Sequence, residues 1–385
     1  MITHHTLYHN PRHYAAFPAV TVTTAGEVLV LFRRARDPRW LRRRALVAGD
    51  ADFDAVDHLD PRSHLALLRL SATTLAPLEA VEILPPDADA ADQDANLLQL
   101  PDNRLLVSGF GWYPFPPPFS EVIAGWGGGW LGSAEETGCL FLFWGGYTRL
   151  SDDGGRSWTP HHWLPGLPGY ADLVPEQRPH HGGGVRGRAV RLADGTLRLA
   201  SYAADPAAGG RYASHLFASD DDGQSWRYHA RIAGDPEGKA GYAEPSLHVD
   251  AQGRLVACHR SFGLGDALVT TVSEDGGSCW SAPVIHKTVI GHPFDVTALP
   301  DGRLCAVYGY RHPPCGIRAR IWNPAGGETI DHAREIILRD DGPSRDLGYP
   351  WVTPLPDGRL LVVYYFCDPH GVRYIAGTTL EPEIP

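Results

Sequence analysis

The chain has 385 residues, among them 43 glycines, 33 prolines and a single methionine, and its formal net charge is −11. Frequent Gly and Pro favour many short strands joined by turns over long helices. The negative charge argues against a partner that is nucleic acid or an anionic membrane, because both need a basic face. No apolar run is long enough for a membrane span, and the first ten residues lack the apolar core of a secretory signal. The six cysteines show no metal-ligand spacing, so we expect a cytoplasmic protein with reduced thiols, no metal and no cofactor.

A tight turn followed by an apolar strand recurs six times along the chain. The turns lie at residues 25–27, 101–103, 193–195, 251–253, 300–302 and 356–358. Gly and Asn at these turns supply the positive φ that tight hairpins require. A second apolar strand precedes each turn, so the chain reads as six hairpins, which suggests six blades. A closed ring of blades would also leave an all-β chain of this length without exposed sheet edges.

A second motif, S-x-D-x-G-x-x-W, follows three of these hairpins, at residues 151–158, 219–226 and 273–280. It resembles the Asp-box, or BNR repeat, of the sialidase (neuraminidase)-like β-propellers. The resemblance implies an all-β fold: a six-bladed β-propeller of four-stranded antiparallel blades, forming one domain over residues 1–385. In that family the box is a structural turn between the outer two strands of a blade, so we expect scaffold residues there.

Polar and aromatic residues concentrate at one end of every hairpin, whereas the opposite turns are plain. In a propeller that end surrounds the central channel, where carboxylates, arginines and histidines in an aromatic funnel are typical of a carbohydrate site. An acidic glycan or oligosaccharide is therefore the expected partner. The residues expected to bind it are Arg34, Asp94, His180, His181, Arg260, His292 and Arg311.

The resemblance also implies a mechanism. Sialidases of this fold use a tyrosine nucleophile paired with a glutamate, an aspartate acid/base, and three arginines that bind the sugar carboxylate. Tyr349, in the first strand of the last blade, matches the nucleophile by position. Glu244 matches the glutamate of an Asn-Glu-Pro segment in the fourth blade, and Arg260 matches the arginine that follows it. A tyrosine suits an anionic substrate, which would repel a carboxylate nucleophile, and the glutamate withdraws the phenol proton.

In the family the acid/base lies in an insert of the first blade. Asp60 has the best spacing for this role and Asp37 is the second choice, but the same insert also contains Asp50, Asp52, Asp54 and Asp57. Arg34 matches the arginine at the end of the family's first hairpin. Arg311, or alternatively Arg318, would supply a further arginine from the fifth blade.

One segment departs from the family's pattern. The family opens with Arg-Ile-Pro, whose arginine belongs to the carboxylate clamp, whereas this chain has Ala16-Phe17-Pro18. An aromatic ring does not replace a bidentate arginine–carboxylate contact. This predicts either a changed sugar specificity or a loss of activity.

Three functional hypotheses follow. The leading one is a sialidase-like exo-acting glycoside hydrolase that acts on an acidic sugar, sialic acid or a relative, at a non-reducing end. The second is a propeller polysaccharide lyase acting on a uronate, with His181 and Tyr349 as base and acid. The third is a carbohydrate-binding propeller without catalytic activity, because a fold does not by itself confer a function. The oligomeric state stays open.

Overall fold

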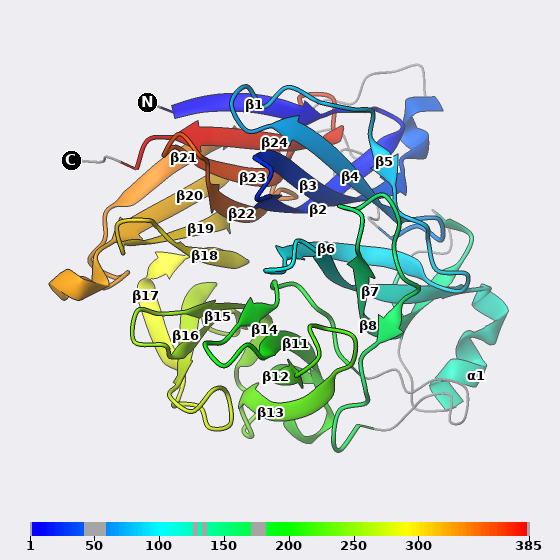
Figure 1. The fold of residues 1–385 in the computed structure, drawn as a ribbon. Helices are drawn as coiled ribbons and strands as arrows, with labels where there is room; N and C mark the ends of the chain where they lie inside the picture. Colours follow the sequence, from blue (N-terminus) through cyan, green and yellow to red (C-terminus); the bar gives the residue numbers. More distant parts are fainter. Residues whose placement is uncertain (1, 42–58, 126–129, 133–136, 171–181, 383–385) are drawn as a thin grey trace.

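The computed structural model describes residues 2–41, 59–125, 130–132, 137–170 and 182–382. In these residues the strands form six four-stranded antiparallel sheets, arranged around a common centre (Figure 1). The predicted six-bladed β-propeller is thereby confirmed. Each of the six predicted tight turns joins the first and second strands of one blade, and the first strand of each blade lies innermost.

The first five blades follow each other along the chain. Blade one comprises β2 (His13–Val22), β3 (Glu27–Arg36), β4 (His64–Ser71) and β5 (Glu82–Ile83). Blade two comprises β6 (Ala91–Gln99), β7 (Leu105–Phe115), β8 (Leu140–Ser151) and β9 (His162–Trp163). Blade three comprises β10 (Val190–Arg191), β11 (Leu197–Asp205), β12 (Arg211–Ser219) and β13 (Arg227–Ala233). Blade four comprises β14 (Gly241–Val249), β15 (Leu255–Phe262), β16 (Ala267–Ser273) and β17 (Val284–Ile290). Blade five comprises β18 (Phe294–Ala298), β19 (Leu304–Tyr310), β20 (Cys315–Trp322) and β21 (Glu335–Gly342).

Blade six joins the two ends of the chain. Its first three strands are β22 (Gly348–Pro354), β23 (Leu360–Cys367) and β24 (Arg373–Leu380). Its outermost strand is β1 (Ile2–Tyr8), which pairs antiparallel with β24 and so closes the ring (Figure 1). The polar composition and high exposure of β1 explain why the sequence alone did not identify it as a strand.

Helical structure is limited to short segments. The described helices are η1 (Pro38–Leu41), η2 (Pro117–Phe119), α1 (Ser120–Gly125), η3 (Pro206–Ala208) and η4 (Pro324–Gly326). Helix α1 packs through Ile123 on the beginning of β8, at the periphery of blade two (Figure 1). In the part of the chain that the structure describes, no helix is both long and apolar enough to cross a membrane.

The hydrophobic core lies between neighbouring blades. One cluster joins Leu31 of β3 to Trp351 of β22, and so holds blade one against blade six. Another joins Ile317 of β20 to Tyr364 of β23, between blades five and six. Each fully buried apolar side chain of this kind contributes about 1.5–3 kcal/mol to stability.

The three Asp-boxes lie between the third and fourth strands of blades two, three and four, as the resemblance implied. In the first box, Asp153 accepts hydrogen bonds from the backbone N–H of Arg156 and Ser157 at 2.9 and 2.8 Å. The indole of Trp158 closes the turn by donating to the Gly155 carbonyl oxygen at 3.1 Å. These side chains are occupied in holding the turn, which agrees with a structural role.

Candidate active site

Four of the six innermost strands carry a β-bulge at the equivalent position. The pairing with the second strand shifts at residues 16–19, 93–95, 243–246 and 348–351. One non-glycine residue in each bulge has a positive φ: Phe17 at 53°, Asp94 at 29°, Glu244 at 47° and Tyr349 at 51°. Such a conformation costs on the order of 1–3 kcal/mol per residue and occurs preferentially at functional sites. A bulge also re-aims a side chain. Here it brings Tyr349 of blade six against Glu244 of blade four and Phe17 of blade one.

Tyr349 and Glu244 form a direct hydrogen bond across the centre. The buried phenol donates to Oε1 of Glu244 at 2.5 Å. Nη1 of Arg260 donates to both carboxylate oxygens of Glu244 at 3.1 and 3.2 Å, and lies 3.5 Å from the phenol oxygen of Tyr349. Burial and then the charge of Glu244 raise the pKa of Tyr349 well above its ordinary value. The phenol is therefore neutral at rest, and Glu244 is positioned to take its proton.

Two further arginines flank the ring of Tyr349. The guanidinium carbons of Arg186 and Arg311 each lie 5.4 Å from the ring centroid, within the range of cation–π contacts. Arg311 is held by the Leu347 carbonyl oxygen at 3.0 Å and the Tyr365 hydroxyl at 3.2 Å. Phe17 packs edge-on against Tyr349 at 4.7 Å, on the segment where the family has an arginine.

Arg186 was not among the predicted site residues. It is buried and donates from Nη2 to the Pro350 carbonyl oxygen at 3.2 Å, while Nε and Nη1 have no hydrogen-bond partner among the described residues. It lies in a glycine-rich segment, residues 182–187, whose last glycine packs against blade four. A Cβ atom on Gly187 would lie 2.5 Å from the carbonyl oxygen of Pro245. That glycine run was the signal in the sequence that could have drawn attention to Arg186.

Asp94 is buried, and its recorded side-chain contact is the amide of Gln93 at 3.5 Å. Burial raises the pKa of Asp94 to about 7, and the charge of Glu244 adds to this effect, against the opposing charges of Arg186 and Arg33. Asp94 and Glu244 therefore interact electrostatically.

His292 is buried beside the arginines of the site. Burial lowers the pKa of His292, and the charges of Arg260 and Arg311 lower it further, so the ring is neutral. Its Nε2 lies 3.9 Å from Asp266. The other two predicted histidines, His180 and His181, lie outside the described residues.

Two predicted residues, Asp60 and Arg34, form hydrogen bonds with groups outside the Tyr349–Glu244 pair. Asp60 accepts two bonds from Nε of Arg36 at 2.9 and 3.1 Å and one from the backbone N–H of Arg62 at 2.8 Å. Arg34 donates to His64 at 3.0 and 3.1 Å and to the hydroxyl of Tyr8 at 3.1 Å.

The face of β3 opposite Arg34 carries Arg33, because successive residues of a strand point to opposite sides. The guanidinium carbon of Arg33 lies 5.8 Å from the centroid of the Phe17 ring, and its Nε donates to the Asp92 carbonyl oxygen at 3.2 Å. The structure thus brings Arg33, rather than Arg34, beside the bulge of blade one. Arg318, the alternative to Arg311, lies over the ring of Tyr310 at 4.7 Å.

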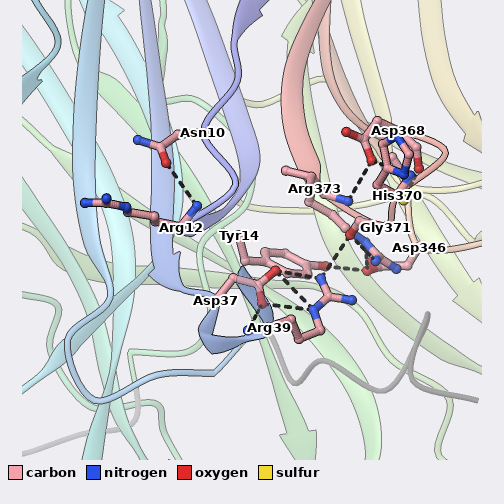
Figure 2. Close-up of polar contacts among 12 residues, drawn as sticks. Asn10, Arg12, Tyr14, Asp37, Arg39, Asp346, Asp368, His370, Gly371 and Arg373 are labelled. Carbon is pink, nitrogen blue, oxygen red and sulfur yellow. Dashed lines mark hydrogen bonds and ion pairs between the residues drawn. The ribbon is translucent and has the colours of Figure 1, made fainter. Parts of the chain in front are cut away.

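A polar network centred on Asp346 links blade one to blade six (Figure 2). Asp346 accepts hydrogen bonds from the hydroxyls of Tyr14 and Tyr365 at 2.6 and 2.8 Å, and from Nε of Arg373 at 2.9 Å. Because Tyr365 also contacts Arg311, this network fixes one of the two arginines that flank Tyr349.

Asp37, the second choice for the acid/base, lies in the same view (Figure 2). Its carboxylate forms an ion pair with Arg39 at 2.6 Å, and Nη2 of Arg39 donates a hydrogen bond to the Gly371 carbonyl oxygen at 2.9 Å. Asp37 is therefore part of the connection between η1 and blade six.

An aromatic arc runs from blade two to blade four. Neighbouring rings in it have centroids 5.4–6.5 Å apart. The arc consists of Trp112, Phe143, Phe110, Tyr202, Tyr212 and Phe262. It ends where the guanidinium carbon of Arg260 lies 4.8 Å from the Phe262 ring. Within the described ranges, no group of three or more His, Cys, Asp or Glu side chains is arranged to hold a metal ion.

The solved structures similar to this one include a protein of unknown function and several sialidases. A protein of unknown function from Dyadobacter fermentans is 32% identical, with a TM-score of 0.86 and 99% of both chains covered. A Hadza microbial sialidase is 15% identical with a TM-score of 0.66, over 99% of this chain and 69% of its own. An intramolecular trans-sialidase from Ruminococcus gnavus is 12% identical with a TM-score of 0.59, over 97% of both chains. At such low identity the two sialidases show the shared fold alone.

No curated protein sequence matches the chain. The model of the BNR repeat-like domain matches residues 123–362. That range contains the three Asp-boxes together with Glu244, Arg260 and Tyr349. With its six-bladed sialidase-like propeller, the chain belongs to the BNR repeat-like domain family.

Proposed function

We propose that the protein is a sialidase-like exo-acting glycoside hydrolase of an acidic sugar, with Tyr349 as the nucleophile and Glu244 as its base. The observation that carries this proposal is the 2.5 Å hydrogen bond between the two side chains. A neutral phenol is a weak nucleophile, and a carboxylate that already accepts its proton makes attack feasible at neutral pH. Attack by Tyr349 would form a covalent glycosyl-enzyme, so the sugar would be released with its configuration retained.

The substrate is assigned to the acidic sugars because of the charges around Tyr349. Arg260 and Arg311 both act electrostatically on His292, and both contact Tyr349. A sugar carboxylate bound between these guanidinium groups would gain charge-assisted hydrogen bonds. Ala16-Phe17-Pro18 stands where the family has Arg-Ile-Pro, so the arginine that the family draws from this segment is absent here. We therefore favour a relative of sialic acid over sialic acid itself.

The test is a screen of aryl glycosides of sialic, ulosonic and uronic acids. Turnover of at least one of them is expected, and Tyr349→Phe should reduce it about 10³-fold or more, as expected for a lost nucleophile. Tyr228→Phe, on the outer strand β13, is the matched control and should keep full activity. Full activity of Tyr349→Phe, an unsaturated product absorbing in the near ultraviolet, or binding without turnover would each contradict the proposal.

A further inference from the structure

We propose that Arg186 is a positioning residue for the nucleophile: it holds the ring of Tyr349 in place and stabilises the negative charge that develops on its oxygen during the reaction. This inference rests on the proposed function and deepens it. The side chain of Arg186 is buried, so it would act through Tyr349 rather than on the sugar. The evidence lies in what Arg186 contacts, in how its segment is anchored, and in its charge.

Arg186 contacts three consecutive residues of β22. Its guanidinium carbon lies 5.4 Å from the ring centroid of Tyr349 and 5.2 Å from that of Trp351. Its Nη2 donates a hydrogen bond to the carbonyl oxygen of Pro350, the residue between them, at 3.2 Å. Tyr349 has a φ of 51°, a conformation that persists only where the surrounding structure holds it. The contacts of Arg186 on both sides of the peptide hold this part of the bulge.

The residue after Arg186 packs beside the strand segment that carries Glu244. Gly187 approaches β14 so closely that a Cβ atom there would lie 2.5 Å from the carbonyl oxygen of Pro245. Pro245 directly follows Glu244 in the sequence. Two adjacent residues therefore pack against β22 and β14, the strands of Tyr349 and Glu244. A displacement of this segment would change the separation of the phenol from the carboxylate, and small misplacements at a reacting centre are costly.

The segment around Arg186 is itself anchored on both sides. On one side, Asn96 of β6 donates from Nδ2 to the Val185 carbonyl oxygen at 3.2 Å. On the other side, Nη2 of Arg188 donates to Asp295 of β18 at 2.8 Å. The same carboxylate oxygen of Asp295 accepts a hydrogen bond from the backbone N–H of Val352, on β22, at 3.0 Å. Residues 185–188 thus connect the innermost strands of blades two, four, five and six.

The positive charge of Arg186 lies beside the phenol without a full set of hydrogen bonds. Its Nε and Nη1 have no hydrogen-bond partner in the part of the chain that the structure describes. A guanidinium stays protonated in proteins. Burial lowers the pKa of Arg186, whereas the charges of Asp295, Asp94, Glu244 and ionised Tyr349 raise it. Because such an interaction is mutual, Arg186 favours the phenolate form of Tyr349, and burial makes the effect stronger than it would be in water.

Negative charge develops on the phenol oxygen in both steps of the proposed reaction. In the first step this oxygen bonds to the anomeric carbon, its proton moves to Glu244, and the glycosidic bond breaks with its electron pair on the leaving oxygen. In the second step a water oxygen bonds to the anomeric carbon, the bond to Tyr349 breaks with its electron pair on the phenol oxygen, and Glu244 returns the proton. A dinitrophenyl glycoside would thus yield the free sugar, dinitrophenolate and one proton from the water. A cation beside the phenol would stabilise both transition states.

The experiment measures the ionisation of the phenol at position 349 directly. Difluorotyrosine is placed at this position alone, because its phenol is more acidic than that of tyrosine and ionises while the protein stays folded, and fluorine NMR follows it against pH. Arg186→Met should raise the pKa of this phenol by about one pKa unit or more, and Arg186→Lys, which keeps the charge, by less. Arg188→Met is the matched control: it disturbs the same segment but contacts Trp351 and Asp295, so the pKa of the phenol should stay within a few tenths of the parent protein.

The same variants are then assayed without the fluorinated residue. On the glycoside that the wild type turns over best, Arg186→Met should lower kcat and kcat/KM by about 10–10²-fold, less than the loss of a direct oxyanion-hole donor. Arg186→Lys should recover part of this activity.

The outcomes separate the two proposals. An unchanged phenol pKa in Arg186→Met overturns the role of Arg186 and leaves the proposed hydrolase standing. An equal rise in Arg188→Met also overturns it, because the effect would then come from the structure of the segment alone. If the wild type turns over no glycoside, the proposed function fails and the role of Arg186 fails with it. Should Arg186→Met not fold, Arg186→Gln takes its place, since its neutral amide keeps a donor for the Pro350 carbonyl oxygen, and the same rise in pKa is expected.

Discussion

The substitution Asp94→Asn should change the free energy of unfolding in a way that depends on pH. Burial and Glu244 raise the pKa of Asp94 from 3.8 to about 7 in the folded state. The folded protein therefore binds one proton more than the unfolded chain between these two values, and stability falls as the pH rises through that window. A difference of about three pKa units corresponds to roughly 4 kcal/mol, at about 1.4 kcal/mol per unit.

Asparagine resembles the protonated aspartic acid in shape and stays neutral at every pH. The variant should therefore match the wild type near pH 4 and exceed its free energy of unfolding by up to about 4 kcal/mol at pH 8. Urea unfolding at a series of pH values measures this difference. Asp60→Asn is the control: it breaks the ion pair with Arg36 and should not stabilise the protein at any pH. A difference between Asp94→Asn and wild type that is the same at pH 4 and pH 8 would refute the reasoning.

Three further predictions concern the groups around Asp94. Glu244→Gln removes a charge that raises the pKa of Asp94, so the pH window in which stability falls should move to lower pH in the urea series; an unchanged window contradicts the coupling. Arg186→Met removes a charge that lowers the pKa of Asp94, so the same window should move to higher pH in urea unfolding at a series of pH values. A Cβ at Gly109 would lie 2.7 Å from the Asp94 carbonyl oxygen, so Gly109→Ala should displace the bulge and lower kcat about tenfold or more, since small misplacements at a site are costly. Gly125→Ala, whose Cβ meets nothing within 4 Å, is its control and should behave as wild type.

The fold could be predicted from the sequence because its signals are local. Each hairpin turn and each Asp-box is specified by a few adjacent residues whose backbone preferences and hydrogen bonds suffice to form it. Strand β1 has no such signal. It is polar and exposed, and only its pairing with the far end of the chain makes it a strand.

The site was predictable only where position along a hairpin determines position in space. Tyr349, Glu244 and Arg260 follow from that rule, and the structure brings them into contact. The direction of a side chain does not follow from it, because a shift of one residue turns a strand residue to the other face. Arg34 was expected to bind the sugar, whereas it is its neighbour Arg33 that the structure places against the ring of Phe17 in the bulge of blade one.

The bulge at Asp94 and the position of Arg186 show what sequence patterns leave out, although Asp94 itself was among the predicted site residues. The bulge at Asp94 is a shift in strand pairing, which depends on the neighbouring strand and on the glycine at position 109. Arg186 reaches the ring of Tyr349 across the centre of the propeller, from a segment far away in sequence. Distances of this kind are set by tertiary packing and leave no local pattern.

The position of Tyr349 depends on how blade six is closed, by the pairing of β1 with β24. Tyr349 lies on β22, and β23 and β24 separate that strand from β1 at the edge of the sheet. If β1 detached, β24 would present an open row of backbone donors and acceptors, ready to pair with another chain. Local detachment of a short, exposed strand requires less free energy than global unfolding. Detachment of β1, by mechanical stress or by proteolysis, would therefore loosen the sheet that holds Tyr349.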